Sequence, residues 1–139
     1  MKTIIANDHE RVGRWACERM GATFAPDVSV AIGLEEDGKL IAGVLYDNYR
    51  KKSICMHVAA EGTRWMTREY LRVCFDYPFR QLGVNKIIGI VGEKNTKARS
   101  FDEHLGFELE HIIKDACEDG DMLIYSMTKE QCRHLRIKS

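Results

Sequence analysis

Two short apolar runs, each followed by a loop and a helical pattern, constrain the fold of this chain more than any other feature. The first run, Ile54 to Ala60, gives way at Glu61-Gly62 to helical spacing. The second, Ile87 to Val91, gives way at residues 92–95 to another helical pattern. In α/β arrangements, ligands collect at the carboxyl ends of such strands, where helix N-termini offer free N–H groups. The stretch 53–107 therefore predicts a binding place for a phosphate-bearing ligand.

The composition is typical of a soluble globular protein. The chain has 139 residues, 45% of them hydrophobic and 30% charged, which is enough to bury a core without disulfides. We see no repeat or linker, so residues 1–139 are expected to form a single domain. A formal net charge of zero gives no global reason to expect a nucleic-acid partner. No apolar run approaches the roughly 20 residues of a membrane span, and the N-terminus lacks a signal-peptide pattern, so we expect a cytoplasmic protein without a membrane partner.

The cysteines are odd in number and scattered along the chain. They lack both a Cys-x-x-Cys motif and Cys/His pairs at zinc-finger spacing. Such a set is typical of free thiols in a reducing cytosol, so we expect neither disulfides nor a metal site. The five are Cys17, Cys55, Cys74, Cys117 and Cys132.

An amphipathic helix is predicted near the N-terminus. Residues 2–6 form a short apolar run that suits an edge strand, and Asn7 with Glu10 three positions later forms a capping-box pattern. Apolar residues then recur at helical spacing until Gly21, which suits a helix C-terminus. We expect a helix over residues 8–20 with one apolar stripe.

Three strands in an antiparallel meander are predicted after this helix. Each is rich in β-branched or alternating apolar residues, and turn residues separate them, including Gly38 in a tight hairpin. The predicted strands cover residues 28–34, 40–46 and 54–60.

The C-terminal half predicts two helices and three strands. Pro78 lies inside the first helical pattern and should kink the helix or split it, because proline removes a hydrogen bond. Gly106 should end the second helix, and the basic tail after Lys129 is predicted to fray. In chain order the elements are a helix over 66–82, a strand over 86–91, a helix over 95–105 and a hairpin of strands 107–113 and 122–127.

This order of elements resembles the GNAT superfamily of acyl-CoA N-acyltransferases. Asn95-x-x-Ala98 followed by Leu105-Gly106-Phe107 is similar to the family's segment that ends in Gly-Phe. Residues 107–110 with 120–127 are similar to the end of the ribosomal-protein N-terminal acetyltransferase branch, and residues 59–68 fall where the family has its pyrophosphate loop. The resemblance implies an α+β (α/β/α) fold, with a central mixed, mostly antiparallel twisted sheet of about six to seven strands flanked by about three to four helices.

The resemblance also implies an activity. The expected reaction is direct attack of a primary amine on acetyl-CoA in a ternary complex, with a small-molecule or protein amine as acceptor. Homodimers are common in this family. Two departures keep a catalytically inactive binding module open as an alternative. No glycine follows Gly62 in the loop, and Asp102 stands where many members carry a tyrosine that protonates the leaving thiolate. A third reading is a nucleic-acid base modifier that uses residues 50–52 and the basic tail.

Ten residues are candidates for binding the cofactor. Arg64 and Arg68 are four apart and would share a helix face, and guanidinium groups suit phosphate oxygens. A solvated basic face would explain them as well. By resemblance, the strand end at 57–59 bonds the pantetheine arm through its backbone, and Asn95, an N-cap in either reading, adds a hydrogen bond. The full set is His57, Val58, Ala59, Arg64, Trp65, Met66, Thr67, Arg68, Asn95 and Arg99.

Three residues are candidates for proton transfer. His57 sits near the end of an otherwise apolar strand, and an imidazole there could deprotonate an amine directly or through water. It could equally be a core histidine bonded to a hydroxyl or carbonyl. Glu61 is an alternative base or an exposed loop acid. The resemblance gives Asp102 the position of the general acid.

The end of the second meander strand borders the acceptor side of the cleft in the GNAT architecture. An acid and two phenols at this edge could hold a cationic amine, or they could form a polar turn with aromatic packing. These candidate substrate residues are Tyr46, Asp47 and Tyr49.

Overall fold

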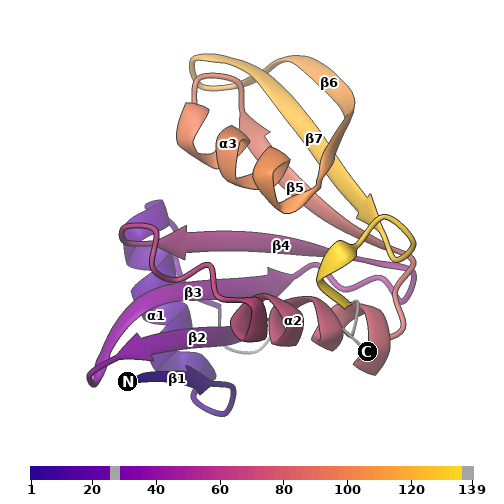
Figure 1. The fold of residues 1–139 in the computed structure, drawn as a ribbon. Helices are drawn as coiled ribbons and strands as arrows, with labels where there is room; N and C mark the ends of the chain where they lie inside the picture. Colours follow the sequence, from indigo (N-terminus) through magenta and orange to yellow (C-terminus); the bar gives the residue numbers. More distant parts are fainter. Residues whose placement is uncertain (26–28, 136–139) are drawn as a thin grey trace.

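A computed structural model of the protein describes residues 1–25 and 29–135. Within these ranges the chain forms a seven-stranded sheet with three α-helices (Figure 1). The strands are β1 (Lys2–Ile5), β2 (Val30–Glu36), β3 (Lys39–Asp47), β4 (Ser53–Ala60), β5 (Lys86–Gly92), β6 (Glu108–Cys117) and β7 (Gly120–Thr128). The helices are α1 (His9–Met20), α2 (Arg68–Asp76) and α3 (Thr96–Leu105), with a π-helical turn η1 (Tyr77–Gln81) and a 3-10 turn η2 (Arg133–Leu135).

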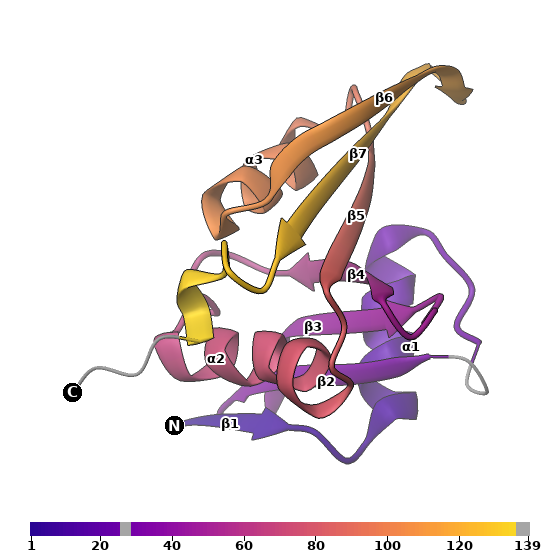
Figure 2. The ribbon, with the colours of Figure 1, turned by 90° about the vertical axis from the view of Figure 1, so that its right-hand side faces the viewer.

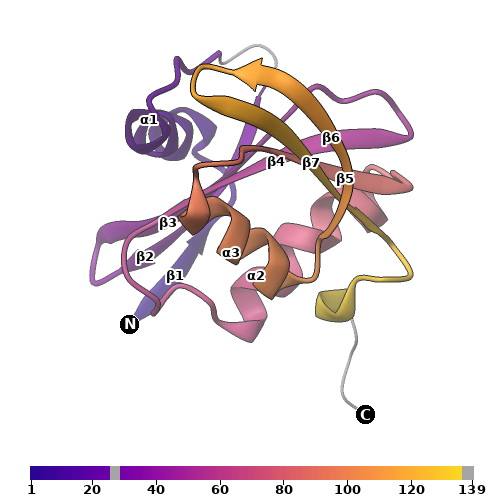
Figure 3. The same ribbon diagram turned by 90° about the horizontal axis from the view of Figure 1, so that it is seen from above.

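The sheet order is β1-β2-β3-β4-β5-β7-β6, and every neighbouring pair is antiparallel except β4 and β5. The expected mixed, mostly antiparallel α+β sheet is confirmed. Helix α1 lies on one side of the sheet, and α2 and α3 lie on the other (Figures 2 and 3). The sheet therefore has two distinct faces, which we call the α1 face and the α3 face.

Two glycines let α1 lie close to its face of the sheet. A Cβ atom on Gly33 would stand 2.8 Å from a methyl carbon of Val12, and one on Gly43 would stand 3.2 Å from the other methyl. Both strand positions face the helix, so a larger residue at either would push α1 outwards. The close contact fixes the end of α1 near β3 and β4.

The parallel pairing of β4 with β5 is short, and the two strands then diverge. Only Ser53, Ile54 and Cys55 of β4 have partners on β5, opposite residues 86–88. Beyond this point β4 pairs only with β3, and β5 pairs only with β7. The divergence leaves the C-terminal halves of β4 and β5 each with one side free of a neighbouring strand.

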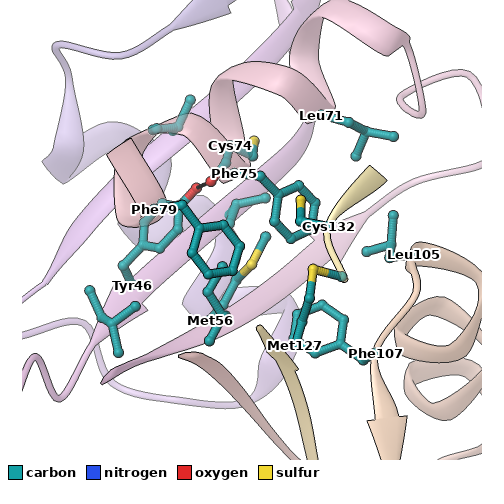
Figure 4. Packing of buried hydrophobic residues seen from close by; sticks show 14 of the residues in the cluster. Tyr46, Met56, Leu71, Cys74, Phe75, Phe79, Leu105, Phe107, Met127 and Cys132 are labelled. Carbon is teal, nitrogen blue, oxygen red and sulfur yellow. Dashed lines mark hydrogen bonds between the residues drawn. The ribbon is translucent and has the colours of Figure 1, made fainter. Parts of the chain in front are cut away.

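The main core lies between the sheet and α2, and Figure 4 shows its aromatic and sulfur-containing side chains. Tyr46 is buried in this core, and its hydroxyl donates to the carbonyl of Cys74 at 2.5 Å. In an α-helix this carbonyl would accept from residue 78, but Pro78 has no N–H group. The phenol thus supplies the donor that the proline lacks.

The predicted break at Pro78 is confirmed. Helix α2 ends at Asp76, and the chain continues through η1, where the N–H of Leu82 donates to the carbonyl of Tyr77 at 3.0 Å. This five-residue spacing is that of a π-turn, in which the helical path continues with one extra residue in the turn. The sequence predicted one interrupted helix over residues 66–82, and the interruption is the change from α-helix to π-turn at Tyr77.

The ends of several elements differ from the sequence prediction, including the hairpin strands β6 and β7, which extend to Cys117 and from Gly120. The N-cap of α1 is Asp8 rather than Asn7, because the Asp8 carboxylate accepts the N–H of Arg11 at 3.3 Å. Glu10 does not complete a capping box, since its carboxylate pairs with Arg14 at 3.1 Å. The strand predicted over residues 28–34 is observed from Val30, and its first residue lies outside the described ranges.

The predicted fraying of the tail after Lys129 is wrong for residues 133–135, which form η2. The ring of His134 stacks on Phe75, with centroids 4.6 Å apart, and its Nε2 donates to the carbonyl of Leu105 at 2.7 Å. Burial lowers the pKa of His134. Leu135 is buried against the same core, so apolar contacts outweigh the basic character of the tail. Residues 136–139 lie outside the described ranges.

The five cysteines are free thiols, as predicted, and four of them are buried. Burial raises the pKa of Cys74 to about 12.

Among the helices that the structure describes, none combines the length and the apolar character of a membrane span.

Candidate active site

A cleft of about 750 Å³ opens where β4 and β5 diverge. Its walls are residues 56–60 of β4, residues 89–91 of β5, one side of α3, the end of α1 and the loop after α1. Because side chains alternate along a strand, each wall strand sends residues to both faces of the sheet. The cleft therefore has an α1 side and an α3 side.

His57 and Asp47 form a hydrogen-bonded pair on the α1 side. His57 lies opposite Leu45, and Asp47 lies opposite Cys55, so the two side chains are diagonal neighbours on adjacent strands. Nε2 of His57 is 2.9 Å from Oδ1 of Asp47, and both residues line the cleft. The histidine side chain is 29% exposed and the aspartate side chain 36%. Neither side chain is sealed in the core, and the partner of the histidine is a carboxylate.

Glu61 also lines the cleft, but its carboxylate has a partner. Arg19 approaches it at 2.8 Å, and the same guanidinium lies 3.8 Å from the centre of the Trp15 ring. The ring and the carboxylate together hold the arginine at the rim of the α1 side. The structure thus brings Glu61 to the cleft as half of an ion pair.

Asp102 lies on the α3 side of the same cleft. Its carboxyl group makes no hydrogen bond or ion pair within residues 1–25 and 29–135. Burial raises its pKa from the ordinary 3.8 to about 7, and the nearby charge of Glu103 adds to this shift. The carboxyl group occupies space above Gly89, where a Cβ atom would come within 2.8 Å of Oδ2. At neutral pH this group can therefore carry a proton to donate.

The first turns of α3 form the outer part of the α3 side. Asn95 caps the helix by accepting the N–H of Ala98 at 3.1 Å, as the sequence predicted, and it lines the cleft. Lys97 and Phe101 line it too, with the ammonium group 5.7 Å from the ring centre. Arg99 points elsewhere, since its guanidinium donates to the carbonyl of Glu93 at 3.2 Å and contacts the hydroxyl of Tyr125 at 3.5 Å.

The loop before α2 is held by contacts outside the cleft. Arg64 pairs with Glu36 at the end of β2 at 2.8 Å. Trp65 is fully buried and packs edge-on against Phe101, with ring centroids 5.5 Å apart. Its Nε1 has no hydrogen-bond partner in the part of the chain that the structure describes. These contacts tie the loop to β2 on one side and to α3 on the other.

The rest of this loop leads into α2. Thr67 caps the helix by accepting the N–H of Tyr70 at 3.2 Å, and Met66 packs partly buried against the main core. Arg68 is exposed in the first turn of α2. None of residues 64–68 is among the described residues that line the cleft, so this loop borders the site without forming its wall.

Of the three candidate substrate residues, only Asp47 lines the cleft. Tyr46 points to the opposite face of the sheet, where it is 1% exposed and bonded to Cys74. Tyr49 is 50% exposed in the turn between β3 and β4 and is not among the described lining residues. The alternation along β3 separates Asp47 from Tyr46, and Tyr49 lies beyond the end of the strand.

Sequence reasoning missed the contribution of α1 and the loop after it. The end of α1 and residues 22, 23, 25 and 29 line the α1 side of the cleft. The sequence predicted only a packing role for this helix, because its stripe of apolar residues gives no sign of which end borders a site. Its role depends on the close approach at Gly33 and Gly43.

No known protein-family profile matches the sequence, and no curated protein matches it either. Solved structures do match. A mutant of the spermidine N-acetyltransferase SpeG from Vibrio cholerae is 18% identical, with a TM-score of 0.70 over 93% of this chain and 94% of that one. A GNAT-family acetyltransferase from Bacillus anthracis is 15% identical, with a TM-score of 0.61 over 84% and 72%.

A third solved structure contains a bound ligand. It is the N-acetyltransferase PseH from Campylobacter jejuni in complex with acetyl coenzyme A, 19% identical, with a TM-score of 0.56 over 73% of this chain and 69% of that one. At these identities the likeness is one of architecture. Together with the sheet order and the divergence of β4 from β5, it shows that this chain has the fold of the GNAT acetyltransferases.

Proposed function

We propose that this protein transfers an acetyl group from acetyl-CoA to a primary amine. The proposal rests on the ionisable side chains that line one cleft. A histidine with a carboxylate partner lies on its α1 side, and a carboxyl group whose pKa is raised to about 7 lies on its α3 side. An acyl transfer to an amine needs a base for one proton and an acid for another, and these groups supply both.

The free side of β4 fits the extended amide chain of the cofactor. Residues 57–59 have strand partners only on β3, so backbone groups on their other side are available to an added extended chain. Asn95 and Lys97 at the start of α3 would lie along the same ligand, with Lys97 offering positive charge. We expect the phosphates near the start of α2, where helix N–H groups and Arg68 converge.

The other candidate cofactor residues act through the loop in this proposal. Trp65, Met66 and Thr67 hold the loop in place by packing and capping. Arg64 reaches a phosphate only by leaving Glu36, and Arg99 supports the start of α3 through the carbonyl of Glu93. The glycine-poor loop thus replaces close backbone approach with side-chain support.

The proposed reaction uses the two sides of the cleft in turn. Acetyl-CoA supplies an acyl group on a thioester. The lone pair of a neutral amine forms the new C–N bond, and His57 takes the proton that the amine loses. As the C–S bond breaks, Asp102 gives its proton to the sulfur. Positioning of both reactants in one cleft supplies much of the acceleration. Glu61 remains the alternative base, although its ion pair with Arg19 must open first.

The acceptor in this proposal enters from the α1 side, past the end of α1. A small-molecule amine is the favoured class.

We also propose a cytoplasmic location, since free thiols persist in a reducing compartment. The expected homodimer stays a prediction.

Calorimetry with acetyl-CoA, followed by an assay of thiol release with a panel of primary amines, tests the function. We expect saturable binding and thiol release that depends on the added amine. No binding at millimolar acetyl-CoA would overturn the proposal. Binding without turnover on any amine would favour the catalytically inactive binding module.

A further inference from the structure

We propose that Asp47 is a positioning residue that fixes the tautomer of His57, so that Nδ1 is the nitrogen that accepts the proton. The inference rests on the proposed function, in which His57 is the base. It changes the expected role of Asp47 from a contact for the substrate to a partner of the base.

The hydrogen bond between the two side chains determines where the imidazole proton sits. Nε2 of His57 lies 2.9 Å from Oδ1 of Asp47. A carboxylate can only accept, so Nε2 must carry the hydrogen. A neutral imidazole has one N–H group, which leaves the lone pair on Nδ1. Nδ1 has no hydrogen-bond partner within the described ranges, so its lone pair is available.

The strand register holds this pair together. Leu45 opposes His57 and Cys55 opposes Asp47, so the two side chains extend from β3 and β4 on the same face, one diagonal step apart. Asn48, the next residue, does not compete for the carboxylate, since its amide contacts the sulfur of Cys55 at 3.8 Å. The pair is thus set by two paired strands rather than by a loop.

Among the described residues that line the cleft, no other cation pairs with the carboxylate of Asp47, so His57 is its partner. Arg19, the arginine that lines the α1 side, is engaged by Glu61 at 2.8 Å. The thiol of Cys17 is a neutral neighbour, because burial and then the negative charge of Asp47 raise its pKa. On the opposite side of the cleft, Lys97 lies near Phe101, and Asp102 lies over Gly89.

Chemistry also favours this role over a direct contact with the substrate. The attacking nitrogen must present a free lone pair, so a carboxylate aimed at the amine would stabilise the ammonium form that cannot attack. A carboxylate aimed at the imidazole stabilises the imidazolium that forms after proton transfer. Nδ1 then holds the proton from the amine, Nε2–H stays bonded to Asp47, and Asp47 itself is not protonated.

Nitrogen NMR of the free protein tests the tautomer without any need for activity. Long-range ¹⁵N–¹H spectra of the wild type, Asp47→Asn and the control Asp119→Asn are compared, and His57→Gln assigns the signals. We expect neutral His57 to be Nε2-protonated in the wild type and in the control. In Asp47→Asn the amide can either donate to Nε2 or accept from it, so the Nε2-protonated fraction of neutral His57 should fall. Nδ1 protonation in the wild type, or no change in Asp47→Asn, overturns the inference.

Kinetics then separate positioning from substrate binding. We expect Asp47→Asn to lower kcat by about 10²-fold, with the KM for the amine within about twofold and partial recovery in Asp47→Glu. A raised KM at unchanged kcat would assign Asp47 to the substrate and overturn the inference. Circular dichroism of each variant confirms folding. If no amine is acetylated while the spectra report Nε2 protonation, the proposed function fails and the tautomer assignment stands.

Discussion

The carboxyl group of Asp102 stands where the side chain of residue 89 would be. A Cβ atom on Gly89 would come within 2.8 Å of Oδ2, closer than real Cβ contacts. Since the backbone of Gly89 is not in the left-handed region, the need for glycine is steric. The absence of a side chain on β5 is what lets a carboxyl group from α3 enter the cleft.

Replacement of Gly89 by alanine should displace this carboxyl group. We expect kcat to fall about tenfold, while the KM for acetyl-CoA stays within about twofold. The matched control on the same strand is Gly92→Ala, where the nearest atom would be the sulfur of Cys117 at an ordinary 3.7 Å. The test is steady-state measurement of kcat and of the KM for acetyl-CoA in both variants. Equal rates in the two would refute the proposed position of the acid.

The pH profile should report the proton on Asp102. With its pKa raised to about 7, the acid is lost as the pH rises through 7, so kcat should decline on that side. In Asp102→Asn this decline should disappear and kcat should drop by about 10²-fold, because the amide cannot donate a proton readily. The measurement is kcat as a function of pH for both proteins, with Asp119→Asn as control. A decline that persists in Asp102→Asn would assign it to another group.

The same carboxyl group should affect stability in a pH-dependent way. Its pKa is about 7 in the folded protein against an ordinary 3.8, so the folded state keeps a proton that the unfolded state has lost. Folding is therefore penalised as the pH rises from 4 to 7, and the penalty is complete above that. We expect Asp102→Asn to raise the free energy of unfolding by about 2 kcal/mol in mildly alkaline buffer and to leave it unchanged in acid below both pKa values. Urea unfolding under the two conditions measures this. A gain of equal size in both would contradict the charge-based explanation.

Removal of the Tyr46 hydroxyl should destabilise the fold. The carbonyl of Cys74 loses its donor in Tyr46→Phe, and Pro78 cannot supply another, so a buried acceptor is left unpaired. We expect a loss of about 1–2 kcal/mol in the free energy of unfolding. Tyr49→Phe is the control, since that ring is half exposed. Chemical denaturation of both variants is the test, and equal stabilities would show that the carbonyl finds water or another donor.

The two arginines around the start of α2 should differ in their effect on cofactor binding. Arg68 is exposed beside the helix N-terminus, whereas Arg64 is engaged by Glu36 at 2.8 Å. We expect Arg68→Glu to weaken acetyl-CoA binding about tenfold and Arg64→Glu to weaken it less than about threefold. Calorimetry at fixed ionic strength compares them. A larger effect from Arg64 would mean that its ion pair opens when the cofactor binds.

The elements that the sequence predicted well depend on local physics. Asn95 caps α3 through a bond to a residue three positions later, and Pro78 interrupts its own helix. Both effects can be read from neighbours in the chain. The choice between Asn7 and Asp8 as N-cap could not be made in this way, because either side chain can cap and the difference lies in where the first turn begins.

The pairing of His57 with Asp47 was beyond sequence reasoning, because it depends on the register between β3 and β4. The turn that sets this register holds Asn48 and Lys51 in left-handed conformations, with φ of 53° and 65°. Glycine is the usual signal for such a turn, and none is present here. The sequence therefore placed both residues near the cleft without showing that they touch.

The contacts of the loop before α2 also could not be predicted from the sequence. The spacing of Arg64 and Arg68 predicted a shared basic face, which requires that both lie on the helix. Helix α2 begins only at Arg68, and the partner of Arg64 is Glu36, which lies 28 residues earlier in the chain. A contact at that separation exists only in the folded protein, so no local pattern could indicate it.

The divergence of β4 from β5 has a consequence for how the protein protects itself in a crowded cell. An unpaired strand at the rim of a sheet invites strands of other chains and can seed aggregation. This sheet has two further unpaired strand sides in its middle, at residues 56–60 and 89–92, enclosed by the walls of the cleft. These free strand sides lie inside the cleft rather than at the rim of the sheet, so the residues that line the cleft shield them from the strands of other chains. The divergence thus leaves backbone groups free for a ligand without adding an exposed edge to the sheet.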